Sequence, residues 1–257
     1  MRWRRLEPVV LPLAAGALLV AVWQAAVKGT GTTVFPSPGA VGKGLAELAR
    51  KGLLFAYVRD SLVRVAAGFG VALAIGIPLG IFLGWQPAAA RAANPVIQFL
   101  RPISPLAWIP VAIVLFGVND TAATFLIFLG SLFPILVAAM NGVRGVPAIY
   151  RQAGRNFGLS RRALVARVVF PAALPELIGG IRIALGIAWL VVVAAEMIAV
   201  NSGLGYLVID SRNAGKRYDL VVAAMVLIGV IGLALNVAVS RLARLRALRW
   251  GFRAEGA

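Results

Sequence analysis

Arg151-Gln152-Ala153-Gly154-Arg155-Asn156-Phe157-Gly158-Leu159-Ser160 is a polar island between two long hydrophobic segments. The run from Tyr150 to Arg167 around it carries five arginines and no acidic residue. Gly158 lies where a helix can end, because glycine readily takes backbone conformations that other residues avoid. The stretch therefore predicts a short helix, a break at Gly158 and a second short helix outside the bilayer, within a loop that covers about 147–171.

The composition indicates a membrane protein. Hydrophobic residues make up 61% of the 257 and charged residues only 14%. A helix needs about 20 mainly apolar residues to cross a bilayer, and barrel strands would instead alternate apolar and polar residues. We expect an all-α membrane protein whose single transmembrane domain, 1–257, has six transmembrane helices at about 9–27, 61–84, 102–118, 121–143, 177–199 and 219–241.

Several local patterns refine this outline. The first apolar run is longer than the core of a secretory signal, so we expect it to be retained as a span. Glycines at every fourth position from Gly76 to Gly84 lie on one helix face and predict the close approach of another helix. Three prolines within 102–110 prevent a regular helix in the first half of the third span. We expect 85–101 to be a polar connection and 39–50 a short surface helix.

The positive charges are distributed by topology. The net charge is +17, and with the N-terminus inside and six crossings the inner segments hold 16 of the 26 Lys and Arg and the outer segments 8. This asymmetry favours cytoplasmic N- and C-termini by the positive-inside rule. Because the charges do not gather on one face, we expect membrane lipid and no nucleic acid as a partner.

The missing residue types exclude most catalytic chemistry. The chain has no Cys and no His, which removes thiol nucleophiles, Ser-His triads and the commonest zinc sites. A phosphate-binding G-x-x-x-x-G-K-[ST] motif does not occur. We therefore expect no enzyme activity, no metal site and no cofactor in this chain, so any ATP chemistry must come from a partner.

The order Gln152-Ala153-Gly154, three residues, Gly158, nine residues, Val168-Val169-Phe170-Pro171 resembles the EAA loop of bacterial ABC importer permeases, which is Glu-Ala-Ala, x3, Gly, x9, Ile-x-Leu-Pro. Four residues depart from that pattern: Gln152, Gly154, Val168 and Phe170. Gln152 lacks the negative charge of the Glu it replaces but can still form hydrogen bonds. Further matches run from about Phe35 to Leu235 and are similar to the nitrate, taurine, aliphatic-sulfonate and bicarbonate group. They are Ser61-Leu62-Val63-Arg64-Val65, Gly76-Ile77-Pro78-Leu79-Gly80, Arg101-Pro102-Ile103-Ser104-Pro105, Trp108-Ile109-Pro110, Ala194-Ala195-Glu196-Met197-Ile198 and Gly203-Leu204-Gly205.

The resemblance implies a type I ABC importer permease in the inner membrane of a bacterium. Its implied partners are two ATPase subunits that carry ATP and Mg, a second permease copy in a homodimer, and an extracytoplasmic substrate-binding protein. The implied substrate is a small anion such as nitrate, taurine, alkanesulfonate or bicarbonate; the alternative is a thiamine-precursor-like or other small organic solute. The residues implied to couple to the ATPase are Gln152, Ala153, Gly154, Arg155, Phe157, Gly158, Leu159, Ser160, Arg161 and Pro171.

Ionisable residues within spans are candidates for function because they are costly to bury. Glu196 lies about 28 Å along the fifth span from its inner end, at 1.5 Å per residue, and Arg64 lies about one turn below the same outer surface. Glu196 and Arg64 could therefore form an ion pair. Asp60 could pair with Arg64 instead, because the two residues are four apart on one helix. For Glu196, a purely structural role competes with a role in a gate or substrate pathway. Polar residues that could line a pathway, or bond their own backbone, are Ser104, Trp108, Asn119, Thr121, Thr124 and Ser131.

Two other classes of membrane protein compete with this interpretation. A secondary transporter or channel predicts two matching halves and acids near mid-membrane, which the sequence lacks. An intramembrane hydrolase without His or Cys would need a Ser-Lys pair, but all four Lys fall in the outer segments. Both alternatives are disfavoured.

Overall fold

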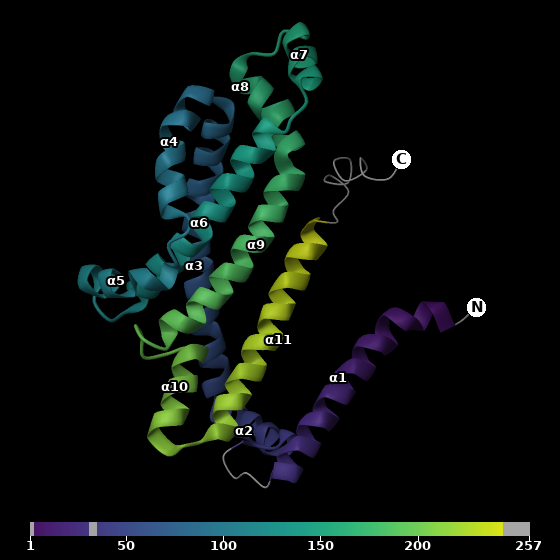
Figure 1. Cartoon of the computed structure of the whole chain (residues 1–257), viewed down its shortest axis with the longest axis vertical. Coiled ribbons are helices and arrows are strands. Elements are labelled where there is room, and N and C mark those ends of the chain that lie inside the picture. The colour runs from purple at the N-terminus through teal and green to yellow at the C-terminus, as the bar shows by residue number, and fades with distance from the viewer. Residues whose placement is uncertain (1–2, 31–34, 244–257) are drawn as a thin grey trace.

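The computed structural model describes residues 3–30 and 35–243, and these residues form helices and connecting turns without a strand. Figure 1 shows a bundle of long helices with short helices at both ends. The elements are α1 (Trp3–Thr30), α2 (Pro38–Arg50), α3 (Leu53–Trp85), α4 (Pro87–Leu100), the 3-10 turn η1 (Pro105–Trp108), α5 (Ile109–Phe116), α6 (Asp120–Arg144), α7 (Ala148–Asn156), α8 (Arg161–Leu164), the π turn η2 (Val165–Val169), α9 (Phe170–Glu196), α10 (Leu204–Gly215) and α11 (Tyr218–Ala243).

Among the described residues, five helical segments are long and apolar enough to cross a membrane: Val10–Gly29, Leu53–Trp85, Asp120–Arg144, Arg161–Glu196 and Tyr218–Arg241. The remaining expected helix, the third span at 102–118, is not a single straight span. Helix α4 and the η1–α5 segment pass the same test only together, and they meet at a bend of 82°. Proline accounts for the bend, since Pro102 and Pro105 leave backbone carbonyls without their helical donors. The all-helical fold class is confirmed, with the third span broken.

The core of the bundle is α6, which packs extensively against both α3 and α9. Helices α3 and α6 can approach closely because α3 has glycines, which carry no side chain, where the two helices meet. A Cβ atom on Gly80 would lie 2.5 Å from the carbonyl oxygen of Leu136, and one on Gly84 would lie 2.7 Å from the Cβ of Val143. Membrane helices associate through this kind of packing because lipid gives little hydrophobic driving force between them. The predicted glycine face is confirmed.

Two segments expected to be irregular are helical. Helix α4 occupies the connection at 85–101, and it buries Ala90 and Ile97, seven residues apart, against α3 and α6. Pro87 lies in its first turn, where a missing N–H costs nothing, so proline starts this helix instead of preventing it. Helix α10 lies between the expected spans at 177–199 and 219–241, where the sequence predicted no span and the connection was expected to be a loop.

The predicted surface helix at 39–50 is confirmed as α2. Ser37 caps its N-terminus by accepting a hydrogen bond from the N–H of Ala40, and Val41 and Leu48 are buried. Glu47 of α2 lies 2.7 Å from Arg217, just before α11, so an ion pair joins the two elements. Figure 1 places α2 and α10 at one end of the bundle, called the α10 end below, and α7 and α8 at the other, the α7 end.

Candidate functional site

The polar island forms a capped helical hairpin at the α7 end. Helix α7 ends at Asn156, and Gly158 has a φ of 73°, in the left-handed region. The N–H of Gly158 donates to the carbonyl of Arg155 at 2.9 Å, and the N–H of Leu159 donates to that of Gly154 at 3.1 Å. This pair of bonds is a Schellman cap, which satisfies the last carbonyls of a helix and favours glycine at the left-handed position. The predicted break at Gly158 is confirmed.

The second half of the expected loop differs from the prediction. Ser160 caps α8 by accepting a bond from the N–H of Ala163, but α8 then continues through the π turn into α9. The N–H of Phe170 donates to Val165, five residues back, while Pro171 has no N–H to donate. The chain therefore passes Pro171 by widening one turn, and Arg161–Glu196 is one continuous rod of 36 residues.

The surface of this hairpin carries arginines that pair with no carboxylate of the described residues, together with exposed aromatic area. Phe157 is 86% exposed at the tip, and Ile149 and Tyr150 are exposed on α7. A hollow of about 410 Å³ lies where α7 faces the turn between α3 and α4, and Trp85, Gln86, Pro87, Ala148, Arg151, Gln152, Arg155 and Arg161 line it. Ala153 and Leu159 are half-buried and Gly154 is buried, so these residues face the interior of the hairpin rather than its surface.

At the α10 end, Arg64 and Glu196 form the ion pair that their depths allowed. The Nη1 atom of Arg64 lies 2.7 Å from Oε1 of Glu196, and their side chains are 4% and 0% exposed. Arg64 also lies 2.7 Å from Asp120, at the start of α6, and it donates to the carbonyl oxygen of Ser202 at 2.9 Å and to the Ser202 hydroxyl. One guanidinium thus ties α3, α6 and α9 to the segment before α10.

The competing partner of Arg64 is engaged elsewhere. Asp60 pairs with the neighbouring Arg59 at 3.1 Å, on the exposed face of α3. The i,i+4 alternative is therefore not the one that forms, because Arg64 turns into the bundle.

Glu196 also holds the N-terminus of α10. Its Oε2 atom accepts from the hydroxyl of Ser61 at 2.9 Å and from the N–H of Gly205 at 2.9 Å, while the Ser61 oxygen accepts from the N–H of Leu204 at 3.0 Å. These acceptors satisfy N–H groups that have no partner within the helix. A Cβ atom on Gly203 would overlap the Glu196 carboxylate, and one on Gly205 would overlap the backbone of α9. The spacing Gly203-Leu204-Gly205 is explained by this contact.

Three of the polar residues predicted to line a pathway bond nearby backbone groups. Ser104 accepts from the N–H of Leu106, Asn119 caps α6, and the buried Ser131 hydroxyl donates to the carbonyl of Ile127 at 2.8 Å. These contacts are local, as expected of Ser and Asn beside helix ends and turns.

Thr121 is exposed at the start of α6, and Thr124 is half-buried one turn later. Of the residues predicted for the pathway, Trp108 lines a large cavity, whereas Arg64 and Glu196 do not.

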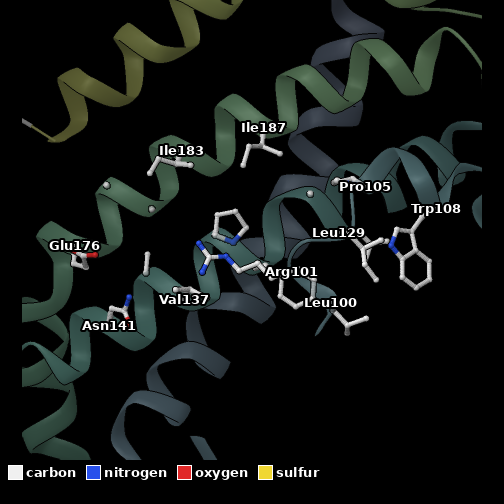
Figure 2. Close-up of a pocket in the computed structure, with 17 residues that line it drawn as sticks. Leu100, Arg101, Pro105, Trp108, Leu129, Val137, Asn141, Glu176, Ile183 and Ile187 are labelled. Carbon is white, nitrogen blue, oxygen red and sulfur yellow. The ribbon is translucent and has the colours of Figure 1, made fainter. Parts of the chain in front are cut away.

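That cavity, of about 690 Å³, opens between α6, α9 and the bend that joins α4 to η1. Figure 2 shows Glu176 and Asn141 at one end of it, Trp108 at the other, and Arg101 reaching in from the bend. The sequence did not single out Arg101, Glu176 or Asn141 as pathway residues. They come from three different elements, and only the fold brings them together.

The model of the family "Binding-protein-dependent transport system inner membrane component" matches residues 76–250. The bicarbonate transport system permease protein of Synechococcus elongatus is 35% identical over 258 residues, covering 95% of this chain and 91% of that protein. A protein of Bacillus subtilis assigned as an aliphatic sulfonates transport permease is 33% identical, covering 99% of this chain and 91% of its own.

The fold matches a solved ABC importer. A chain of the MetNI methionine ABC transporter, in an inward-facing conformation, superposes with a TM-score of 0.66 at 21% identity, over 75% of this chain and 95% of that one. At this identity the likeness establishes the fold alone, which is that of a type I ABC importer permease. The family match covers most of the chain, and the resemblance stated from the sequence is confirmed. The chain belongs to the family of inner membrane components of binding-protein-dependent transport systems.

Proposed function

We infer that this chain is the transmembrane subunit of an ATP-driven importer, and that it works as a homodimer with two ATPase subunits and an extracytoplasmic substrate-binding protein. The observation that carries this inference is the hairpin at the α7 end. It exposes Phe157 and several arginines that form no ion pair with another described residue, beside the glycine cap at Gly158, and it continues without a loop into the 36-residue helical segment Arg161–Glu196. An exposed aromatic next to polar groups is typical of a protein interaction site. ATP hydrolysis then occurs on the separate ATPase subunit.

The α7 end is assigned to the cytoplasm. The 16 positive residues of the inner segments, against 8 in the outer ones, support cytoplasmic termini in the inner membrane of a bacterium. In this orientation the Arg64–Glu196 network lies near the outer surface. Because both side chains are buried and lie outside the cavity, we assign them a positioning role and no contact with substrate.

The cavity between α6 and α9 is proposed as this subunit's share of the substrate pathway, closed by the second copy. Two of the relatives are permeases of a bicarbonate and of an aliphatic-sulfonate transport system, which supports a small anion as substrate here. Nitrate, taurine, alkanesulfonate and bicarbonate all fall within that class. A small organic solute resembling a thiamine precursor is the second candidate, favoured by the largely apolar wall around Phe133 and Ile183.

The docking role is tested with Gly158→Val and Phe157→Ala. Gly158 faces open space, but its φ of 73° costs a β-branched residue about 1 to 2 kcal/mol, so the cap should be lost while the bundle stays folded. We expect both variants to co-purify with much less ATPase and to lose substrate-stimulated ATP hydrolysis in liposomes. Wild-type behaviour of both would contradict the docking assignment.

Matched controls exist on the same chain. Gly70→Val makes the same change on an open face of α3 with ordinary helical backbone, and Phe55→Ala removes a phenylalanine that is 73% exposed at the opposite end. Both controls should retain the ATPase.

The orientation is tested by cysteine labelling, since the chain contains no cysteine. Lys43→Cys, on α2, should react with an impermeant maleimide in intact cells, and Arg155→Cys, on α7, should react only after the membrane is opened. The reverse pattern would overturn the orientation.

A further inference from the structure

Three arginines line the hollow between α7 and the turn that joins α3 to α4. Arg151 and Arg155 belong to α7, and Arg161 begins α8. Arg151 is half-buried and the other two are exposed. None of them forms an ion pair with another described residue, and no acidic residue of the described ranges lines the hollow. The charged groups of the hollow are therefore all positive.

This concentration of like charge is unfavourable in the isolated chain. Arg151 and Arg155 are four residues apart on α7, so they are neighbours on one helix face, and like charges at this spacing repel each other. Arg161 adds a third positive charge to the same hollow. The nearest acidic residue along the chain, Glu176, lines the other cavity, between α6 and α9. An anion from outside the chain would replace this repulsion by attraction.

The depth of the hollow points to the lipid headgroups as the source of that anion. In the arrangement proposed above, Arg64 lies near the membrane surface at the α10 end, and Trp85 is about 32 Å further along α3 at 1.5 Å per residue. The hydrocarbon core of a bilayer is about 30 Å thick. Trp85, which lines the hollow, thus lies at the opposite headgroup layer, where tryptophan is enriched in membrane proteins. Figure 1 shows α7 at this end of the bundle.

The chemistry of the hollow suits a phosphodiester. The planar guanidinium group of arginine binds phosphate oxygens through two parallel hydrogen bonds, and Gln152 adds an amide donor. Pro87 and Ala148 provide apolar surface beside these groups. The volume, about 410 Å³, is that of a site for a small organic molecule, so the hollow has room for more than a phosphate ion.

We propose that the hollow binds the headgroup of an anionic phospholipid, with the phosphodiester on Arg151, Arg155 and Arg161. Basic pockets between membrane helices on the cytoplasmic side bind such headgroups. The bound lipid would hold α7 against the turn between α3 and α4. This site goes beyond the importer function inferred above, and Phe157 and Gly158, on which the docking test depends, do not line it.

The test uses the full chain in phosphatidylcholine nanodiscs to which phosphatidylglycerol is added in steps. Both lipids carry the same acyl chains, so the headgroup is the only difference between them. Binding is followed by tryptophan fluorescence at constant ionic strength, because Trp85 lines the hollow. The variant Trp85→Phe identifies the part of the signal that comes from this site.

We expect the signal of the wild type to saturate, with its midpoint at about one-tenth phosphatidylglycerol. This midpoint means a roughly tenfold preference over phosphatidylcholine, which corresponds to about 1.4 kcal/mol. The hollow variant combines Arg151→Gln, Arg155→Gln and Arg161→Gln, and it should lose the preference because the phosphodiester loses its cationic partners.

A matched control removes the same amount of charge from the same end of the bundle. It combines Arg144→Gln, Arg162→Gln and Arg167→Gln, which change three exposed arginines that do not line the hollow. The control should keep the midpoint of the wild type. Equal loss of preference in the control and in the hollow variant would show that the arginines act only as a diffuse surface charge, and the site would be overturned.

Two further results would assign the hollow to a different occupant and overturn the proposal. A saturable response to inorganic phosphate, in nanodiscs of phosphatidylcholine alone, would identify a site for a free anion and not for a lipid. Retained lipid preference in the hollow variant, together with lost co-purification of the ATPase, would assign the three arginines to an acidic surface of the ATPase. The binding assay contains no ATPase, so its outcome does not depend on the docking inferred above.

Discussion

The two ends of the bundle treat charge in opposite ways. At the α10 end, the Arg64–Glu196 pair is buried, and each charged group has several hydrogen-bond partners. At the α7 end, the run from Tyr150 to Arg167 carries five arginines, and none pairs with a carboxylate of a described residue. The buried pair makes its contacts inside the chain, whereas the arginines of the hairpin form no ion pair with any described residue.

This difference in charge burial predicts different consequences for substitutions at the two ends. Taking ions out of water costs several kcal/mol each, so a buried pair survives only when its remaining bonding positions are filled. No buried side-chain nitrogen or oxygen in the described ranges lacks a partner. Exposed arginines pay no such cost and contribute little to stability. We therefore expect substitutions at the α10 end to affect folding, and those at the α7 end to affect only partner binding.

The largest expected effect comes from breaking the buried pair. Arg64→Gln leaves the buried Glu196 carboxylate without its ion-pair partner, which should lower the free energy of unfolding by about 3 to 5 kcal/mol. Glu196→Gln should cost less, because Arg64 keeps Asp120 at 2.7 Å. The double variant should be no worse than Arg64→Gln alone, because no buried charge without a partner remains. Unfolding in detergent, followed by circular dichroism and by size-exclusion chromatography, measures both.

Arg182→Gln serves as the reference, since this arginine is exposed and bonds a neutral Asn236. It should change the unfolding free energy by less than about 1 kcal/mol. Fully additive losses at Arg64 and Glu196 would show that the two residues act independently, and the contrast between the ends would lose its basis.

A smaller effect compares one glycine from each end. Gly203 and Gly158 both have positive φ, but a Cβ atom at Gly203 overlaps the Glu196 carboxylate, whereas one at Gly158 meets nothing within 4 Å. Gly203→Ala should destabilise the chain by about 3 kcal/mol, from overpacking and backbone strain together. Gly158→Ala should cost only about 1 kcal/mol, confined to the hairpin. The measurement is the thermal unfolding temperature of the two variants. Equal decreases would show that the room available for the added Cβ atom does not determine the loss of stability.

The smallest effect concerns the surface ion pairs of α2. The hydrogen bond from Arg217, helped by Lys51, lowers the pKa of Glu47 from 4.5 to about 2. A carboxyl whose pKa falls on folding stabilises the fold fully above its unfolded pKa and loses that contribution as the pH drops through the folded value. The difference in unfolding temperature between wild type and Glu47→Gln should thus stay constant from pH 7 to about 4.5 and then shrink toward pH 2.

High salt should reduce this difference, because Glu47 and Arg217 are partly exposed. A difference that disappears already at pH 5, or that ignores salt, would show that the α2–α11 contact does not depend on this pair.

The sequence was informative where one residue type imposes one geometry. Gly158 in a polar run predicted the helix break, because left-handed backbone favours glycine, and the depth of Glu196 and Arg64 along apolar spans allowed their contact. Hydrophobic length also predicted the long helices. Hydrophobic length did not predict α4, which is amphipathic, or α10, which is short and of mixed composition. It also missed the break in the third span, where proline decides where the chain bends rather than whether it is helical.

The cavity could not be predicted at all. Arg101 and Glu176 belong to elements far apart in the chain, and each is an ordinary residue in its own local sequence. Likewise, Asn119 and Ser131 have side chains that suit a pathway equally well, and only the structure shows that they bond their own helices.

The rod from Arg161 to Glu196 connects the two ends directly. At 1.5 Å per residue it is about 54 Å long, and it begins at the hairpin and finishes at the carboxylate that caps α10. No loop interrupts this segment, so we expect a displacement of the hairpin to move the far end of α9 as well. Regular α-helical hydrogen bonding along it is interrupted at the π turn, Val165–Val169, and at Pro175, and any bending of the rod should concentrate there.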